Sequence, residues 1–166
     1  LVILGNRLKA NGSHVAIEVG KNYGDLPLVE CYAGQLNQVF MNILGNAIDA
    51  LESRRLNASE ADAAPAITIT TRPLKAEEIE IRIADNGPGV PEDVQPRLFD
   101  PFFTPKPVGK GTGMGLSISY QVITETHQGT LRVTSSQAEA DRGTTFIITL
   151  PTVLTPAAPT ATAGSL

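Results

Sequence analysis

Apolar residues repeat at helical spacing in one long segment of the chain, and they form short runs elsewhere. Between residues 35 and 55 they recur every third or fourth position, which predicts an amphipathic helix. Weaker helical spacing predicts helices over 1–9 and 112–126, the second with Thr112 as its N-cap. Shorter apolar runs predict strands over 14–19, 27–32, 67–72, 79–84, 131–135 and 145–150.

This order mixes helices and strands without a strict βαβ alternation. It therefore favours an α+β fold, a two-layer α/β sandwich with a mixed, mostly antiparallel sheet. Glycine and proline crowd residues 87–115 too densely for regular structure, and residues 56–65 are typical of a loop. We expect one folded domain over 1–151. The Pro/Ala/Thr-rich segment 152–166 is typical of a disordered tail or linker.

The composition narrows the possible functions only slightly. The chain has 166 residues, a formal net charge of −4 and 42 % hydrophobic residues. This balance argues against nucleic-acid binding, and neither a membrane span nor a signal peptide is apparent. The single cysteine, Cys31, is expected to be a small buried hydrophobe. Because the chain begins at Leu1 rather than methionine, we expect it to be part of a longer protein.

The face of the 35–55 helix opposite its apolar stripe carries Gln38, Asn42, Asn46 and Asp49. A solvated face is one interpretation. However, asparagine and aspartate are poor helix formers, whereas an ordinary exposed face carries lysine or glutamate. Carboxamide oxygens are suitable ligands for Mg²⁺, whose remaining ligands are usually water molecules and the phosphates of the substrate. The pattern therefore favours a functional role for Asn46.

The segment 85–90, Asp-Asn-Gly-Pro-Gly-Val, follows an apolar strand. Its composition is also that of a surface turn. A carboxylate at the end of a buried strand needs hydrogen-bond donors, and the amino group of adenine would supply one. Gly87 and Gly89 would let the backbone close around a flat base.

The segment 109–119, GKGTGMGLSIS, places glycine at every second position before a helix. Such a backbone can point successive N–H groups at an anion, and a helix N-terminus is itself an anion site. Lys106 and Lys110 stand just upstream. A flexible loop with a helix cap is the alternative. The segment fits neither the P-loop pattern nor the dinucleotide fingerprint.

In this order and spacing, the segments resemble the catalytic ATP-binding domain of two-component sensor histidine kinases, within a group that includes gyrase and MutL. The resemblance covers about residues 12–151 and implies a Bergerat-type sandwich, a mixed sheet packed on three helices. The motifs are the N box at 35–50, the G1 box at 85–89, the F box at 98–106, the G2 box at 109–116 and the turn before the last strand at 143–146.

The resemblance implies ATP and Mg²⁺ as cofactors. Asn46 would hold the metal, with Asn42 beside it, and Asp85 would accept the adenine amino group. The segment 98–106 would contribute Phe99, Phe102 and Phe103 as an apolar cluster, either a local core or a docking element for the histidine-bearing helices. The remaining nucleotide-binding candidates are Asp49, Gly87, Gly89, Val90, Lys106, Lys110, Gly111, Thr112, Gly113, Met114, Gly115, Leu116 and Thr145.

The resemblance further implies transfer of the γ-phosphoryl group to a histidine. Water-using relatives carry a glutamate as general base at the position of Asn42, and asparagine cannot take a proton. Neither His14 nor His127 lies in the sequence context of a phosphate-accepting histidine. His127 is expected at the C-terminal end of a helix, where a positive charge interacts favourably with the helix dipole. We therefore expect a dimerisation and phosphoacceptor helix hairpin N-terminal to Leu1.

The expected partners are this hairpin and a response-regulator receiver domain. The isolated domain is expected to be a cytoplasmic monomer, and the full-length kinase a homodimer whose membrane attachment the sequence leaves open. Two alternatives remain, an ATPase of the gyrase or MutL type and a catalytically silent nucleotide-binding signalling module.

Overall fold

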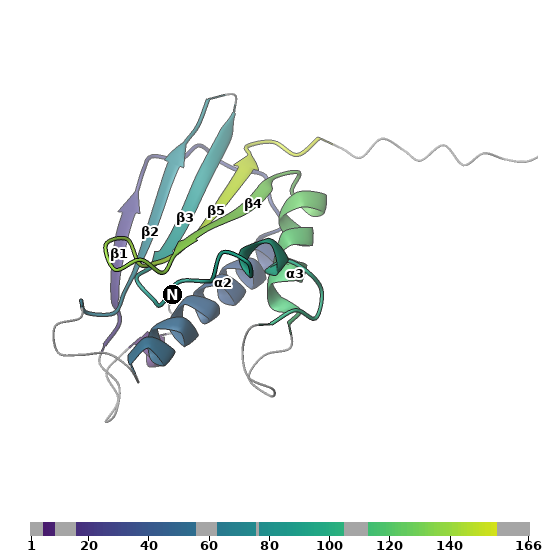
Figure 1. The fold of residues 1–166 in the computed structure, drawn as a ribbon. Coiled ribbons are helices and arrows are strands. Elements are labelled where there is room, and N and C mark those ends of the chain that lie inside the picture. The colour runs from purple at the N-terminus through teal and green to yellow at the C-terminus, as the bar shows by residue number, and fades with distance from the viewer. Residues whose placement is uncertain (1–4, 9–15, 56–62, 76, 105–112, 156–166) are drawn as a thin grey trace, which may run out of the picture.

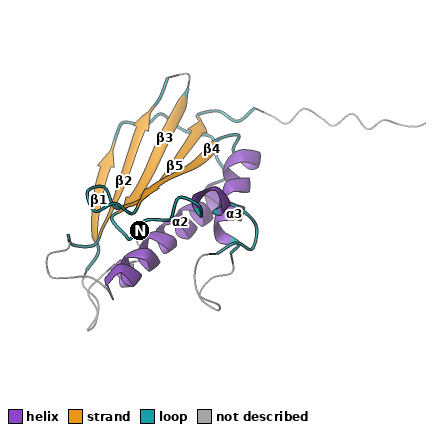
Figure 2. Cartoon of the chain, in the orientation of Figure 1, coloured by secondary structure: helices purple, strands orange, loops and turns teal. Residues whose placement is uncertain are grey.

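The structure, a computed structural model, describes residues 5–8, 16–55, 63–75, 77–104 and 113–155. Figure 1 shows a sheet with the helices along one of its faces, and Figure 2 shows the same two layers by type of element. The elements are α1 (Gly5–Leu8), β1 (Glu18–Tyr23), α2 (Ala33–Arg55), β2 (Ala66–Pro73), β3 (Glu78–Asp85), the 3₁₀ turn η1 (Gln95–Arg97), α3 (Gly115–Gln121), its π-helical continuation η2 (Val122–Thr126), β4 (Thr130–Ser136) and β5 (Gly143–Pro151).

The five strands form one sheet in the order β1-β2-β3-β5-β4. The β1–β2 pair is parallel and the other three pairs are antiparallel. The predicted α+β sandwich with a mixed, mostly antiparallel sheet is therefore confirmed. Because β3 and β5 are neighbouring interior strands, their ends place residues from distant parts of the sequence side by side.

The core lies between the sheet and α2, as the apolar periodicities require. Along β3, alternate isoleucines face the helices, and Ile83 pairs with Phe146 of β5. On α2, Ile43 and Ile48 are completely buried. Burying each such side chain contributes about 2 kcal/mol, so this face fixes the helix against the sheet.

Most predicted elements are confirmed, with the 35–55 helix observed as Ala33–Arg55. The strand predicted over 27–32 is wrong, because this segment carries the chain from the sheet to α2. The strand predicted from residue 14 is described only from Glu18. The predicted cap by Thr112 is also wrong, since α3 begins at Gly115 and Met114 occupies the N-cap position.

Two further differences concern the chain surface. Cys31 is exposed rather than buried, because it lies in the connection that leads into α2. Residues 152–155, assigned from sequence to the tail, are hydrogen-bonded to the domain, and Thr152 N–H donates to Glu77 O at 2.7 Å. Among the described residues, no helix is both long and apolar enough to span a bilayer.

Candidate functional site

Asp85 ends β3 on the side of the sheet that faces the helices. It continues the two-residue alternation of the buried isoleucines, and only 8 % of it is exposed. Burial raises the pKa of the Asp85 carboxyl to about 6, and backbone N–H groups of Gly87 and Thr144 partly offset this rise. The Gly87 N–H donates to Asp85 Oδ1 at 2.8 Å. Since a carboxylate has about four lone-pair sites, Asp85 can accept a further amine.

The bend that follows β3 is held against both α2 and β4. Arg54 of α2 donates to the backbone carbonyl of Asn86. A Cβ on Gly87 would lie 3.3 Å from the Ala50 side chain of α2. Gly89 has a φ of 75°, and a Cβ there would lie 2.0 Å from a β4 carbonyl oxygen. Glycine at this position is therefore required by the close approach to β4.

The asparagine stripe of α2 runs from this bend to the start of α3. Asn42 Nδ2 donates to the Gly115 carbonyl at 2.9 Å and to Ser119 Oγ at 3.1 Å. Ala50, which contacts the bend, lies on the same face about 12 Å further along the helix axis. Asn46 is half-buried and lies between them on that face. The structure thus brings the bend, the stripe and the α3 N-terminus together.

Asp49 is placed differently from the two asparagines. Arg7 of α1 donates to Asp49 at 2.6 Å and to Glu52 at 3.0 Å. Both carboxylates are more than one-third exposed, so the ion pairs are surface interactions. They attach α1 to α2, which gives Asp49 a structural partner that the sequence pattern did not reveal.

The predicted glycine-rich segment is described only from Gly113 onward. Gly113 has a φ of 66°, and a Cβ there would lie 2.4 Å from the Phe102 backbone. A Cβ on Gly115 would lie 3.4 Å from Asn42 Cγ. Met114 is 40 % exposed, whereas Leu116 packs against the core. The other candidates of this segment, Lys106, Lys110, Gly111 and Thr112, lie outside the described residues.

The register of β5 separates Thr144 from Thr145. Thr144 pairs with Asp85 and with Ser135, so all three lie on the helix-facing side. Thr145 pairs with Ala84 and faces the opposite side of the sheet. The sequence motif predicts Thr145 as the nucleotide-binding threonine, and strand register adds Thr144 as the threonine on the face of Asp85. The alternation along β5 could have found it, because Thr144 shares parity with the buried Phe146, Ile148 and Leu150.

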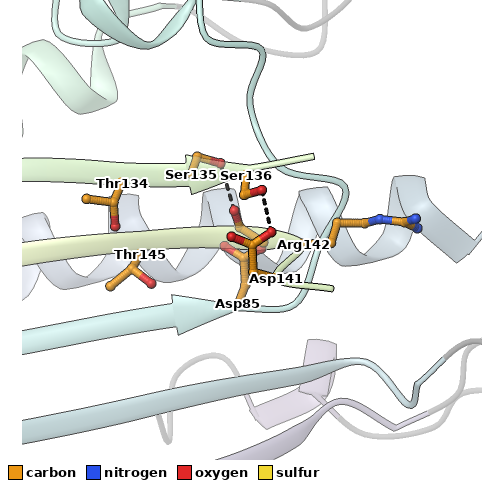
Figure 3. A pocket seen from close by; sticks show the side chains of 8 residues that line it. Asp85, Thr134, Ser135, Ser136, Asp141, Arg142 and Thr145 are labelled. Atoms are coloured by element: carbon orange, nitrogen blue, oxygen red, sulfur yellow. Dashed lines mark hydrogen bonds between the residues drawn. The ribbon is translucent and has the colours of Figure 1, made fainter. Parts of the chain in front are cut away.

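A polar pocket of about 390 Å³ lies at the ends of β3, β4 and β5. Figure 3 shows Ser136 directed toward Asp141, whose carboxylate accepts its hydroxyl at 2.7 Å. The same view shows Thr134 and Thr145 side by side on neighbouring strands. By strand register Thr134, Ser136 and Thr145 lie on the sheet face opposite the Asp85 side chain, so this pocket is distinct from the α2 side of the site. The lining residues are Asp85, Thr134, Ser135, Ser136, Asp141, Arg142, Gly143 and Thr145.

The three phenylalanines of the 98–106 segment do not form the expected apolar cluster. Phe99 packs against Tyr120 of α3 with ring centroids 5.3 Å apart. Phe103 lies under the Arg97 guanidinium at 4.4 Å. Phe102 is 75 % exposed and has a φ of 66°. The backbone of this segment, rather than a shared core, contacts the start of α3 at Gly113.

His127 is buried at the end of η2 and cannot serve as an exposed phosphate acceptor, since only 1 % of it is exposed. Its Nε2 accepts the Tyr32 N–H at 3.0 Å, while Nδ1 lies 2.8 Å from the Val122 carbonyl. These partners require a proton on Nδ1 and none on Nε2.

Comparison with known proteins decides the family. A family model described as "Histidine kinase-, DNA gyrase B-, and HSP90-like ATPase" matches residues 32–154. The chain belongs to this ATPase family. Its match includes α2, the Asp85 bend, α3 and the last two strands, which are the elements that build the site.

The relatives within the family are sensor kinases. The chain is 38 % identical over 143 residues to sporulation kinase E of Bacillus subtilis (strain 168), with 86 % of this chain covered. It is 39 % identical over 143 residues to the sensor kinase CckA of Brucella abortus (strain 2308), with 83 % of this chain covered. The chain spans only 17 % and 15 % of these two relatives.

A solved structure shows the same fold. The nucleotide-free catalytic domain of histidine kinase ThkA superposes with a TM-score of 0.67 at 25 % identity, covering 91 % of this chain and 84 % of that one. The resemblance to histidine kinase catalytic domains drawn from the sequence motifs is thereby confirmed.

Proposed function

We propose that this domain binds Mg-ATP and donates the γ-phosphoryl group to a histidine on a separate dimerisation helix hairpin, as part of a sensor kinase. The observation that carries the proposal is the single face of α2 that joins the Asp85 bend to the N-terminus of α3. It aligns a carboxylate for the base, carboxamides for a metal and a helix N-terminus for phosphates. The family membership and the names of the relatives support this reading.

The base would bind at the Asp85 end. The carboxylate accepts the adenine amino group, and Gly87, Gly89 and Val90 border the base. We assign the threonine of the base site to Thr144 instead of Thr145, because Thr144 lies on the same sheet face as Asp85. Because the pKa of Asp85 is about 6, the group is mostly ionised at neutral pH and acts as an acceptor.

The phosphates would bind between the stripe and α3. Gly113, Met114, Gly115 and Leu116 present the start of the helix, and the segment before them supplies Lys106, Lys110, Gly111 and Thr112. Asn46 would hold Mg²⁺ through its carboxamide oxygen, a hard ligand of the kind this ion prefers. Mg²⁺, when bound with the nucleotide, supplies charge neutralisation on the phosphates. Among the described residues no three His, Cys, Asp or Glu side chains cluster, so phosphates and waters would complete the shell.

The chain itself contributes positioning rather than acid–base chemistry. Asn42 cannot accept a proton, and its amide hydrogens already bridge to α3. This favours transfer to a nucleophile that needs little activation, such as neutral imidazole. It disfavours hydrolysis by a gyrase- or MutL-type ATPase, the main alternative, while a catalytically silent signalling module is the second.

The acceptor and the partners lie outside the described chain. The acceptor histidine would be on the helix hairpin of the full-length kinase, which we expect to be a homodimer, whereas the isolated domain is a monomer. The downstream partner would be a response-regulator receiver domain, since one solved neighbour is a histidine kinase in complex with its response regulator. The domain itself would reside in the cytoplasm.

The test is a calorimetric titration of ATP with and without Mg²⁺. Asp85→Asn should weaken ATP binding about 100-fold or more, because a buried acceptor for the base is lost. Asn46→Ala should weaken chiefly the Mg²⁺-dependent part of the binding. Binding of both variants at the affinity of the parent would refute the site.

A second experiment separates the three functions. A cognate hairpin carrying its histidine is added and the γ-phosphate is followed. Label on the hairpin supports the kinase, release of free phosphate supports an ATPase, and binding without turnover supports a silent module.

A further inference from the structure

The hydroxyl group of Ser135 joins three segments at the base end of the site. It lies 2.8 Å from the Val90 backbone nitrogen, 2.7 Å from the Gly143 carbonyl oxygen and 2.9 Å from Thr144 Oγ1. These partners belong to the bend after β3 and to the start of β5. Ser135 is itself on β4, so one side chain connects three strand ends.

Counting protons fixes the direction of each hydrogen bond. Ser135 has one hydroxyl proton, and the Gly143 carbonyl can only accept, so that proton goes to Gly143. The Val90 N–H donates to Ser135 Oγ. Thr144 must therefore donate its hydroxyl proton to Ser135 as well. The Thr144 oxygen is left with acceptor capacity only.

The Gln95 side chain binds the backbone carbonyl groups of the same bend and of β4. Its Nε2 donates to the Val90 carbonyl and to the Ser135 carbonyl, each at 3.0 Å. Val90 is thus fixed through both its N–H and its C=O. The preceding Gly89 approaches the Ser136 carbonyl so closely that no Cβ fits. The base-lining backbone is therefore tied to the end of β4.

We propose that Ser135 is a specificity-determining residue of the nucleotide site, with Gln95 as a second positioning residue. By taking the Thr144 proton, Ser135 makes the Asp85–Thr144 pair a surface that only accepts hydrogen bonds. Adenine carries a donating amino group at the position where guanine carries an accepting oxygen. At this position the pair therefore accepts the adenine amino group and repels the guanine O6 atom. This inference rests on the proposed function, and it adds which residues set the base preference.

The decisive variant is Ser135→Ala, with Ser136→Ala as its matched control. Removing the Ser135 hydroxyl frees the Thr144 proton to turn and donate to guanine. Ser136 is the neighbouring serine of the same strand, but its hydroxyl faces the other side and donates to Asp141. The affinities for ATP, GTP and inorganic tripolyphosphate are measured by calorimetry for each variant.

We expect Ser135→Ala to weaken ATP binding about tenfold and to lower the ATP-to-GTP affinity ratio about tenfold. Tripolyphosphate binding should stay at the parent value, because the phosphate end is untouched. Ser136→Ala should retain all three affinities. A parent-like ATP-to-GTP ratio in Ser135→Ala would overturn the inference, and so would an equal loss of selectivity in Ser136→Ala.

Further variants keep the test valid if Ser135→Ala is poorly folded. Ser135→Thr retains the hydroxyl and should restore the ratio. Gln95→Glu replaces two donated hydrogen bonds by repulsion between its carboxylate and the Val90 and Ser135 carbonyls. It should weaken ATP but not tripolyphosphate, and parent-like ATP binding in it would contradict the role of Gln95. Thermal unfolding verifies the fold of each variant.

The same titrations distinguish the two proposals. If the parent binds no ATP, the proposed function itself fails. If the parent binds ATP, Asp85→Asn does not, and Ser135→Ala keeps full selectivity, only the role of Ser135 is refuted.

Discussion

The two ends of the candidate site are built in different ways. At the Asp85 end, the side chains stand on neighbouring strands, and their partners are backbone groups such as the Gly87 N–H. At the α3 end, the contact is between two helices and depends on side chains, with Asn42 donating to Gly115 and Ser119. One end is fixed by the sheet, whereas the other depends on side-chain packing and on the Asn42 hydrogen bonds between two helices.

This difference indicates where selectivity lies. Strand register fixes the Asp85, Thr144 and Ser135 row with little freedom, which suits recognition of a rigid base. Helix α3 is only seven residues long and begins without a side-chain cap. The first turn of α3 is therefore held by side-chain packing and by Asn42, without a capping hydrogen bond of its own.

After the Asp85→Asn substitution, the largest effect should come from pH acting on the Asp85 end. Lowering the pH from 7 to 5 protonates Asp85, whose pKa is about 6, and removes its charge as an acceptor. ATP affinity should then fall about tenfold beyond the change seen for tripolyphosphate, which shares the phosphate titration. A carboxyl-carbon NMR titration should place the Asp85 midpoint near 6 and lower it when nucleotide binds. An ATP affinity that follows tripolyphosphate at every pH would contradict this.

The same raised pKa predicts that the folding stability of the nucleotide-free protein changes with pH in the direction opposite to ATP affinity. Because the folded pKa of Asp85 lies above its ordinary 3.8, the folded state binds the proton more tightly. The contribution of Asp85 is full below about pH 4 and is lost as the pH rises through 6. Asp85→Asn should flatten this part of the stability profile in urea unfolding.

A smaller effect is expected from Asn42→Ala at the α3 end. The change removes two hydrogen bonds to α3 and leaves the buried Ser119 hydroxyl with one partner fewer. The free energy of unfolding should fall by about 1–2 kcal/mol. ATP affinity should fall about fivefold, with the ATP-to-GTP ratio unchanged. The control is Gln38→Ala, which removes only the exposed bond from Gln38 to Asn42. A changed base preference in Asn42→Ala would show that the two ends are not independent.

The smallest effect should come from Arg7→Ala, which detaches α1 from Asp49 and Glu52. Exposed ion pairs contribute little, so a loss of about 0.5 kcal/mol is expected, and it should vanish in 1 M salt. Thermal unfolding at low and high salt measures it. Unchanged ATP affinity would indicate that Asp49 only attaches α1 to α2. A strong change in ATP affinity would instead support a role of Asp49 in nucleotide binding.

Sequence periodicity was sufficient for the main elements, whereas the site residues remain a prediction. The 35–55 helix and the Asp85 strand were predicted because their apolar faces are long and regular. The segment 27–32 was mistaken for a strand, because a short apolar run does not say whether another strand is free to pair with it. Thr145 was chosen over Thr144 because the motif marks a turn and not the face of the strand that follows.

The sequence by itself determined which chemical groups are available: a carboxylate at the end of a buried strand, carboxamides on one helix face and glycines before a second helix. These features are local, so spacing along the chain reveals them. Only the tertiary structure decided which groups meet. In the folded chain Thr144 pairs with Asp85, and Asn42 donates hydrogen bonds to α3. Asp49 forms an ion pair with Arg7, and the Ser135 hydroxyl contacts the ends of three strands. Such contacts join residues far apart in the chain, and they depend on strand register and helix packing, which local patterns do not fix.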